Sequence, residues 1–417
     1  MTGHSWLSVS MMLRAGRMRR WREGRGRAFY PPLDTPFAVR LAWRFLPRIL
    51  WKTARVREVS IVGIERLEAI RGAAAVLTPN HPTNLDPVVL FELSRQLGEP
   101  FNYLASRESF SVPGIGWALQ RCGAYSIMRG AVDRAAIKTT RSLLVGGRKI
   151  VMFPEGLTYG QNDTLMPFHE GVAQFGFWAL DDTKGAGPLW YVPIGLRYRF
   201  MKPMDDEISL AVWRLEKHIG IPVDLSVPVY DRLRAVGTRV VEGYEKAYGV
   251  RPGATDTLDE RIQRMKNLWV ARAAAVLGIE DHASLALGDR IRAIVNALDR
   301  MVIAEDASAF TKETMRRRHA ETQPLYKDLE RAGRFLATGA TYVAERPTDE
   351  RFLEVIGRME EELFGFSPPR GPRRAVLTVG EPVDVSLLYE AYKADSRKTV
   401  SESTRMIEDA VRALIAV

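Results

Sequence analysis

The chain has 417 residues, of which 46% are hydrophobic, 9% aromatic and 26% charged, and this ordinary globular composition excludes a wholly disordered protein. Its single cysteine, Cys122, excludes an internal disulfide framework and a cysteine-rich zinc site. The formal net charge is +10, and the first 60 residues hold 13 lysines and arginines but only three acids, whereas the remaining residues hold 47 bases and 47 acids. A cationic segment on a neutral chain indicates an anionic partner surface, either a membrane or a nucleic acid.

The N-terminal segment combines this charge with apolar side chains. Residues 37–55 place aromatic and aliphatic residues among arginine and lysine and contain no acid, which favours a helix lying in the headgroup plane of a membrane. A solvated arm with a buried aromatic stripe is the alternative, and no nucleic-acid-binding motif is present. No apolar run approaches the roughly 18–20 residues that a membrane-spanning helix needs. We therefore expect residues 1–58 to form a cationic amphipathic segment that places a peripheral protein on the cytoplasmic side of an anionic membrane, without a nucleic-acid partner.

The next part of the chain alternates short apolar runs with helix-length segments, which predicts an α/β domain. The β-like runs are 73–77, 101–105, 124–128, 149–153 and 190–195, and the helical segments between them are 84–97, 111–121, 131–146 and 170–181. Residues 205–370 instead show long stretches of helical periodicity. These stretches are 228–248, 258–277, 283–304, 310–337 and 348–364. After a linker at 366–374, a β-like run at 375–379 and a helix at 399–416 close the chain.

The main chemical motif follows the first β-like run. Residues 78–87 read TPNHPTNLDP, so His81 lies at the carboxyl end of a strand, where α/β folds place reactive groups. Asp86 lies five residues later, at the start of a helical segment. A carboxylate that reaches one imidazole nitrogen fixes the tautomer and leaves the other nitrogen to take a proton from a hydroxyl. The alternative is that Asp86 only caps the helix and that His81 is an ordinary loop residue.

Three further blocks follow this motif in order: SVPGIGWALQRCGAYSIMRG at 111–130, FPEG at 153–156 and VPIG at 192–195. The set resembles the four blocks of the glycerolipid acyltransferases of the lysophosphatidate (1-acylglycerol-3-phosphate) acyltransferase type. The resemblance covers about 60–200 and 375–385. It implies an α/β acyltransferase domain, a mixed sheet flanked by helices, at 59–204 plus 371–417, with 205–370 as a mainly helical insertion.

The resemblance also implies the reaction. A fatty acyl group would pass from acyl-CoA or acyl-carrier protein to a hydroxyl of a lysolipid of the lysophosphatidate type, with His81 as general base and Asp86 as its orienting partner. The acyl thioester is a co-substrate, and no cofactor is implied; no His or carboxylate pattern has metal-ligand spacing either. A transacylase that takes its acyl chain from a phospholipid, and a catalytically silent membrane-associated scaffold, remain alternatives.

The family's acceptor-binding positions fall on Arg129 of the second block and Glu155 of the third. The planar fork of an arginine suits a phosphate, and Gly156 gives the backbone the freedom for a tight turn. Asn80, beside His81, is a further candidate for substrate binding. His169 stands where relatives often have a lysine; we expect it either to contact head-group or donor phosphates or to begin a helix.

The third block departs from the family pattern. The family usually continues Glu-Gly-Thr-Arg-Ser, whereas this chain reads Glu-Gly-Leu-Thr-Tyr, so Thr158 replaces a phosphate-binding arginine. Losing one charge-assisted contact weakens phosphate binding by roughly 1.5–3 kcal/mol. Either another cation, such as Arg197 or Arg199, takes over, or the acceptor is a lyso-diester phospholipid, an aminolipid or another lipid without a phosphate monoester.

Overall fold

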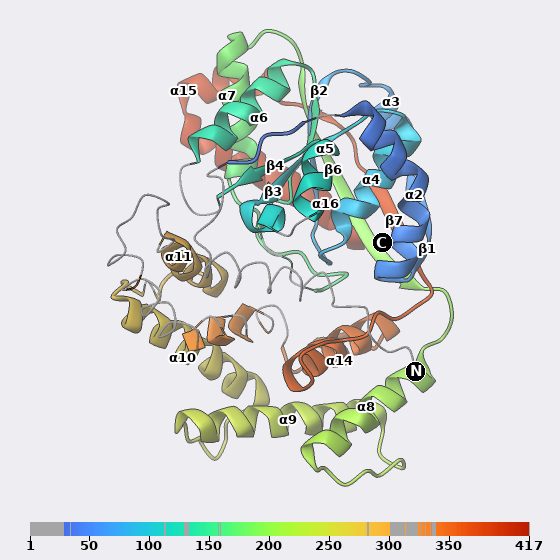
Figure 1. Cartoon of the computed structure of the whole chain (residues 1–417). Coiled ribbons are helices and arrows are strands. Elements are labelled where there is room, and N and C mark those ends of the chain that lie inside the picture. The colour runs from blue at the N-terminus through green and yellow to red at the C-terminus, as the bar shows by residue number, and fades with distance from the viewer. Residues whose placement is uncertain are drawn as a thin grey trace. The chain divides into compact units, whose positions relative to one another are not determined.

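The chain divides into two compact units in the computed structural model (Figure 1). The sheet unit includes Gly26–Met201 and Pro369–Val417, and the helical unit includes Lys202–Pro368. The structure describes residues 29–33, 35–111, 114–128, 133–156, 158, 160–281, 283–300, 313, 324–325, 327–329, 331–333, 335 and 339–416. The arginine cluster before residue 28, Arg129 and most of the helix predicted at 310–337 lie outside these residues.

The sheet unit is built on a mixed sheet, which in the described chain has eight strands in the order β1-β7-β6-β2-β5-β3-β4, with β8 beside β6. The strands are β1 Val56–Val62, β2 Ala74–Pro79, β3 Asn102–Ser106, β4 Ala124–Ile127, β5 Lys149–Val151, β6 Leu189–Phe200, β7 Arg373–Val379 and β8 Val383–Asp384. The pairs are parallel except for β6 with β7 and with β8. The predicted mixed sheet and its β-like runs are confirmed, and β1 is an addition that takes residues 56–58 into the sheet.

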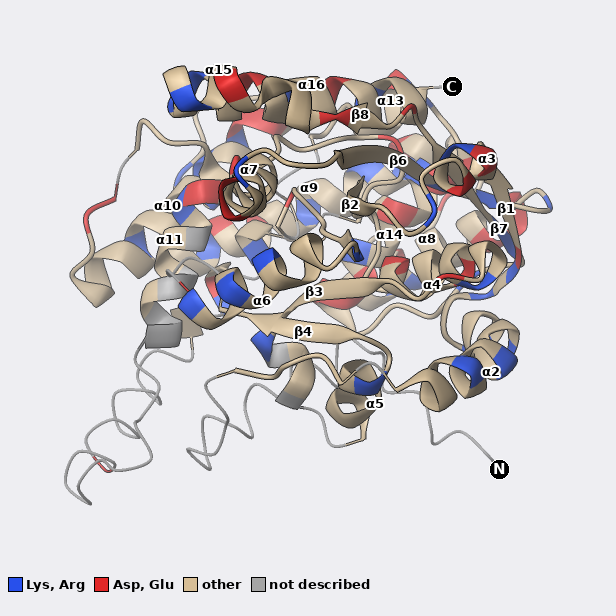
Figure 2. Ribbon diagram, turned by 90° about the horizontal axis from the view of Figure 1, so that it is seen from above, with Lys and Arg blue, Asp and Glu red and all other residues tan. Residues whose placement is uncertain are grey.

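Helices cover both faces of this sheet. The helices on one side are α2 Pro36–Ala54, α3 Ile64–Glu68, α4 Asp86–Leu97 and α5 Ile115–Arg121; those on the other are α6 Arg134–Val145, α7 Gly171–Thr183, α15 Tyr389–Ala394 and α16 Ser396–Ala416. Short 3-10 turns occupy Arg107–Ser111 and Val385–Leu388. Figure 2 shows β6 and β2 between α16 and α4. Because Ala75 and Leu77 enter one core and Val76 the other, β2 is apolar on both faces from Ala74 to Leu77, as buried parallel strands are.

Strand β6 continues beyond the end of its neighbour β2. Their pairing stops at Pro79 and Ile194, while β6 runs on to Phe200. The side-chain amide of Asn80 then donates to the Leu196 carbonyl (2.9 Å) and accepts from the Leu196 N–H (2.7 Å). The Asn162 amide makes the same two bonds with Tyr198, each 2.6 Å long. Two side chains thus satisfy buried backbone groups that a strand would otherwise pair. Through its two bonds, Asn80 also fixes the chain directly before His81.

The helical unit contains α8 Asp205–Ile219, α9 Val229–Tyr248, α10 Leu258–Leu277, α11 Leu287–Arg300, α13 Tyr342–Glu345 and α14 Asp349–Leu363 in its described part. The helices predicted at 228–248, 258–277 and 348–364 are confirmed to within a residue. Helix α10 begins at a capping box formed by Thr257 and Glu260, which supplies partners for its first N–H groups. Helix α8 was not predicted. Its three acidic residues at the start and its buried Ile208, Val212 and Leu215 mark it as an amphipathic helix with a favourable dipole.

Candidate active site

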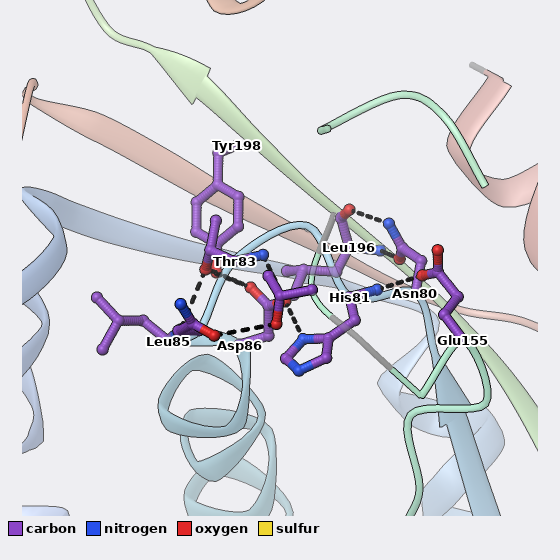
Figure 3. A network of polar contacts seen from close by, with 10 residues as sticks. Asn80, His81, Thr83, Leu85, Asp86, Glu155, Leu196 and Tyr198 are labelled. Atoms are coloured by element: carbon purple, nitrogen blue, oxygen red, sulfur yellow. Dashed lines mark hydrogen bonds and ion pairs between the residues drawn. The ribbon is translucent and has the colours of Figure 1, made fainter. Parts of the chain in front are cut away.

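The turn between β2 and α4 brings a histidine and an aspartate together. Asp86 is the first residue of α4, where the positive end of the helix dipole favours a carboxylate. The chain between them folds back so that His81 Nδ1 lies 2.7 Å from Asp86 Oδ2 (Figure 3). The contact expected from the five-residue spacing is therefore present.

Asp86 is fully buried, with 0% of its surface exposed, and hydrogen-bond donors surround it. Oδ2 accepts from the Thr83 N–H (2.8 Å) in addition to His81, and Oδ1 accepts from Thr83 Oγ1 and from the Tyr198 hydroxyl, each at 2.6 Å. Burial and the neighbouring Asp86 carboxylate hold the pKa of Tyr198 well above its usual value, so the phenol keeps its proton and donates. These contacts fix the orientation of the Asp86 carboxylate.

The His81 imidazole is held on its face as well as at its edge. It stacks on the Phe153 ring with 3.9 Å between centroids, and 15% of its side chain is exposed. Because Nδ1 faces Asp86, Nε2 is the nitrogen left for an incoming hydroxyl. This is the arrangement of a general base with an orienting carboxylate.

Glu155 contacts the same turn, and 2% of its surface is exposed. Its Oε1 accepts from the backbone N–H of His81 (2.6 Å), and its Oε2 accepts from the backbone N–H of Met166 (3.0 Å). Burial, together with the charges of Asp86 and Glu408, raises the pKa of Glu155 to about 7, although the two N–H groups oppose the shift. Glu155 therefore contacts the protein backbone through both carboxylate oxygens.

The other expected binding residues lie around this turn. Asn80 is buried, and its amide bonds to β6 as described above. Gly156 has φ +73°, which fits the tight turn expected of it. Thr158 is half-buried and donates to Asn84 Oδ1 (3.0 Å). His169 is half-buried and lies two residues before α7, where its backbone N–H donates to the Pro154 carbonyl. Arg129 lies outside the described residues.

The two candidate replacement cations lie on β6. Arg197 is buried, and it stands between Leu196 and Tyr198, whose side chains enter the core that contains α4. Since successive strand residues face opposite sides, Arg197 lies on the face that Gly195 presents to Leu414 of α16, away from Asp86. Arg199 is half-buried on the same strand. The described residues contain no group of three His, Cys, Asp or Glu side chains that could hold a metal ion.

Sequence reasoning missed two residues of the site, Thr83 and Tyr198. Thr83 lies inside the motif and bonds both oxygens of Asp86 through its own backbone and side chain. Tyr198 follows the fourth block between Arg197 and Arg199, and nothing in that local sequence singles it out. It joins the site because β6 extends beyond β2.

Comparison with known families places this site inside a recognised domain. Residues 58–180 match the family model described as Acyltransferase, a stretch that runs from β1 into α7 and contains His81, Asp86 and Glu155. This match supports an acyltransferase domain at residues 58–180 and a general acyl-transfer function. No curated protein matches the chain in sequence.

Proposed function

We propose that the protein transfers a fatty acyl group from an acyl-CoA or acyl-carrier-protein thioester to a hydroxyl of a lysolipid at a membrane surface. The observation that carries the proposal is the contact between His81 Nδ1 and the buried Asp86 carboxylate within an acyltransferase domain. His81 Nε2 takes the hydroxyl proton as the acceptor oxygen attacks the thioester carbonyl. The tetrahedral intermediate then collapses, the carbon–sulfur bond breaks, and the imidazolium returns the proton to the departing thiolate.

Direct transfer without an acyl-enzyme agrees with the state of Cys122. This thiol is half-buried, and burial raises its pKa above the usual value, whereas a nucleophilic cysteine needs a lowered pKa. A thioester is already activated, so a base that prepares the acceptor hydroxyl suffices.

The motif blocks suggest two classes of acceptor lipid. We propose a lysophosphatidate-type lipid as the first candidate because the four motif blocks resemble that type. The second candidate is a lysolipid without a phosphate monoester, because Thr158 and Asn84 bond to each other as neutral groups where the family has an arginine. A neutral pair offers a phosphate neither charge nor a bidentate fork.

Helix α2 supports the membrane part of the proposal. Its exposed side carries two stripes, each repeating every four residues: apolar Phe37, Leu41, Phe45 and Ile49, and cationic Arg40, Arg44, Arg48 and Lys52. Figure 2 shows α2 with basic and no acidic segments.

On neighbouring α5, Trp117 is 60% exposed, with the Arg121 guanidinium 4.2 Å from its ring centroid. Aromatic rings beside cations suit the headgroup layer, where each cation near an anionic leaflet contributes about 1 kcal/mol. No helix among the described residues has the length and apolar character to cross a membrane.

The catalytic proposal is tested by acyl transfer from labelled acyl-CoA to lysophosphatidate, lysophosphatidylcholine and a lyso-aminolipid, with wild type and His81→Ala side by side. We expect the variant to keep its fold by circular dichroism and to lose roughly 10³-fold or more in rate. Transfer only to the second or third lipid would select the second acceptor class. No His81-dependent transfer to any acceptor, with carrier-protein and phospholipid donors included, would leave the scaffold alternative.

The membrane proposal is tested by sedimentation of the full chain with vesicles that contain anionic lipid. Replacing Phe37 and Phe45 by Asp should release the protein, while Leu387→Asp, at an apolar residue that is 81% exposed elsewhere in the sheet unit, should not. Equal binding of both variants and wild type would remove α2 from the docking surface.

A further inference from the structure

Four contacts hold His81 in place, and Glu155 makes one of them. Asn80, the residue before His81, is bonded to β6. The His81 ring stacks on Phe153, and His81 Nδ1 contacts Asp86. The backbone N–H of His81 donates to Glu155 Oε1. Figure 3 shows the Glu155 carboxylate directed at the His81 backbone, on the far side of the imidazole from Asp86.

The second oxygen of Glu155 ties the same turn to the long loop after β5. Oε2 accepts from the Met166 N–H. That loop is itself fixed to the sheet by the Asn162 amide and to α16 by the Phe168 N–H, which donates to Glu408 Oε2 (2.8 Å). The carboxylate is thus enclosed between the catalytic turn and the loop.

These contacts distinguish two roles for a carboxylate in such a site. An acceptor-binding carboxylate needs an oxygen that a ligand can reach, whereas 2% of the Glu155 surface is exposed and both its oxygens face backbone donors. A carboxylate that accepts from two N–H groups matches their chemistry completely. A neutral amide of the same shape must turn its NH₂ group, which only donates, toward one of them.

We propose that Glu155 is a positioning residue, whose carboxylate clamps the backbone of His81 against the loop at Met166 and sets the imidazole for the acceptor hydroxyl, and that it does not bind the acceptor. The inference rests on the proposed acyl transfer. It differs from the acceptor-binding role that the family resemblance implies. Reaction rates depend steeply on such placement, since a shift of about 1 Å costs on the order of 10²-fold.

The experiment compares wild type, Glu155→Gln and the matched control Glu170→Gln, an exposed carboxylate just before α7. Steady-state rates are measured with the acceptor that wild type uses, and binding of that acceptor is measured without donor by titration calorimetry. For Glu155→Gln we expect kcat to fall roughly 10- to 100-fold, with the KM and the Kd of the acceptor within about twofold of wild type. Glu170→Gln should match wild type in all three.

An acceptor KM and Kd raised tenfold or more with kcat unchanged would overturn the inference, as would wild-type kinetics in Glu155→Gln. If Glu155→Gln melts below the assay temperature, the same split is read from Glu155→Asp, which keeps the charge but is one methylene too short to span both N–H groups. His81→Ala separates the two proposals. Absence of His81-dependent transfer in wild type refutes the proposed function, whereas a changed acceptor Kd in an active enzyme refutes only the role of Glu155.

Discussion

Each unit of the protein contains a lysine whose side chain is entirely buried, but the two are treated differently. Lys149 of β5 donates to the carbonyls of Ile70 (2.9 Å) and Ala73 (3.4 Å) and pairs with Glu99 at 2.9 Å. Lys266 of α10 has no hydrogen-bond partner for its Nζ among the described residues. Burial lowers the pKa of both; for Lys149 the Glu99 carboxylate opposes the shift, whereas the pKa of Lys266 falls to about 8.

The difference shows what a partner does for a buried charge. Lys149 joins segments that must keep their relative positions, and Asp86 is of the same kind, since several donors fix its two oxygens. In the helical unit Lys266 costs desolvation without an equivalent return. Removing a partnered charge should therefore harm the protein, and removing the unpartnered one should stabilise it.

The largest effect is expected at Asp86. Asp86→Asn keeps the shape of the side chain but directs an amide NH₂ group at one of the donors and removes the charge that stabilises the imidazolium. We expect the rate of acyl transfer to fall roughly 10³- to 10⁴-fold with the fold intact, as measured by initial rates and circular dichroism. A rate within tenfold of wild type would contradict the role of Asp86.

Lys149→Met removes the buried cation that has partners. It leaves Glu99 and two buried carbonyls without the cation, so the free energy of unfolding should fall by about 2–4 kcal/mol. Urea unfolding followed by fluorescence measures the change. An unchanged or raised stability would show that these contacts contribute nothing to the sheet unit.

Lys266→Met makes the same substitution on the unpartnered side. An apolar side chain of similar length replaces a buried cation, so the free energy of unfolding should rise by about 1–3 kcal/mol. The same urea experiment serves, with Lys149→Met as the matched control. A loss of stability would contradict the inference that the buried Lys266 cation destabilises the helical unit.

The smallest expected effect is the pH dependence of the difference in unfolding free energy between wild type and Lys266→Met. The pKa of Lys266 is about 8 in the folded chain and near 10.5 when the chain unfolds, so the unfolded state binds more protons between these values. Wild-type stability should therefore rise with pH from about 8 to 10.5 relative to Lys266→Met, and the gap between the two should narrow. Urea unfolding midpoints of both proteins at pH 7, 8.5 and 10 measure this difference. A difference in stability that is independent of pH would exclude a lowered pKa of Lys266.

Much of the sheet unit could be predicted because its buried strands are short apolar runs between glycine and proline. Strand β1 was missed because Arg57 and Glu58 are exposed on it and conceal its alternation within the cationic segment. The contact between His81 and Asp86 follows from local spacing. Tyr198 lies 112 residues from Asp86, and only the register of β6 brings it there. That the Glu155 oxygens face the backbone depends on the course of a loop, which no residue type specifies.

The two asparagine side chains beside β6 give this protein an internal reporter. The amide hydrogens of Leu196 and Tyr198 bond to Asn80 and Asn162 rather than to a neighbouring strand. Their exchange with deuterated solvent therefore requires these hydrogen bonds to break. Asn80 is joined directly to His81. The rate of exchange at Leu196 therefore measures how often the turn at His81 leaves its place, in the protein alone and without any ligand.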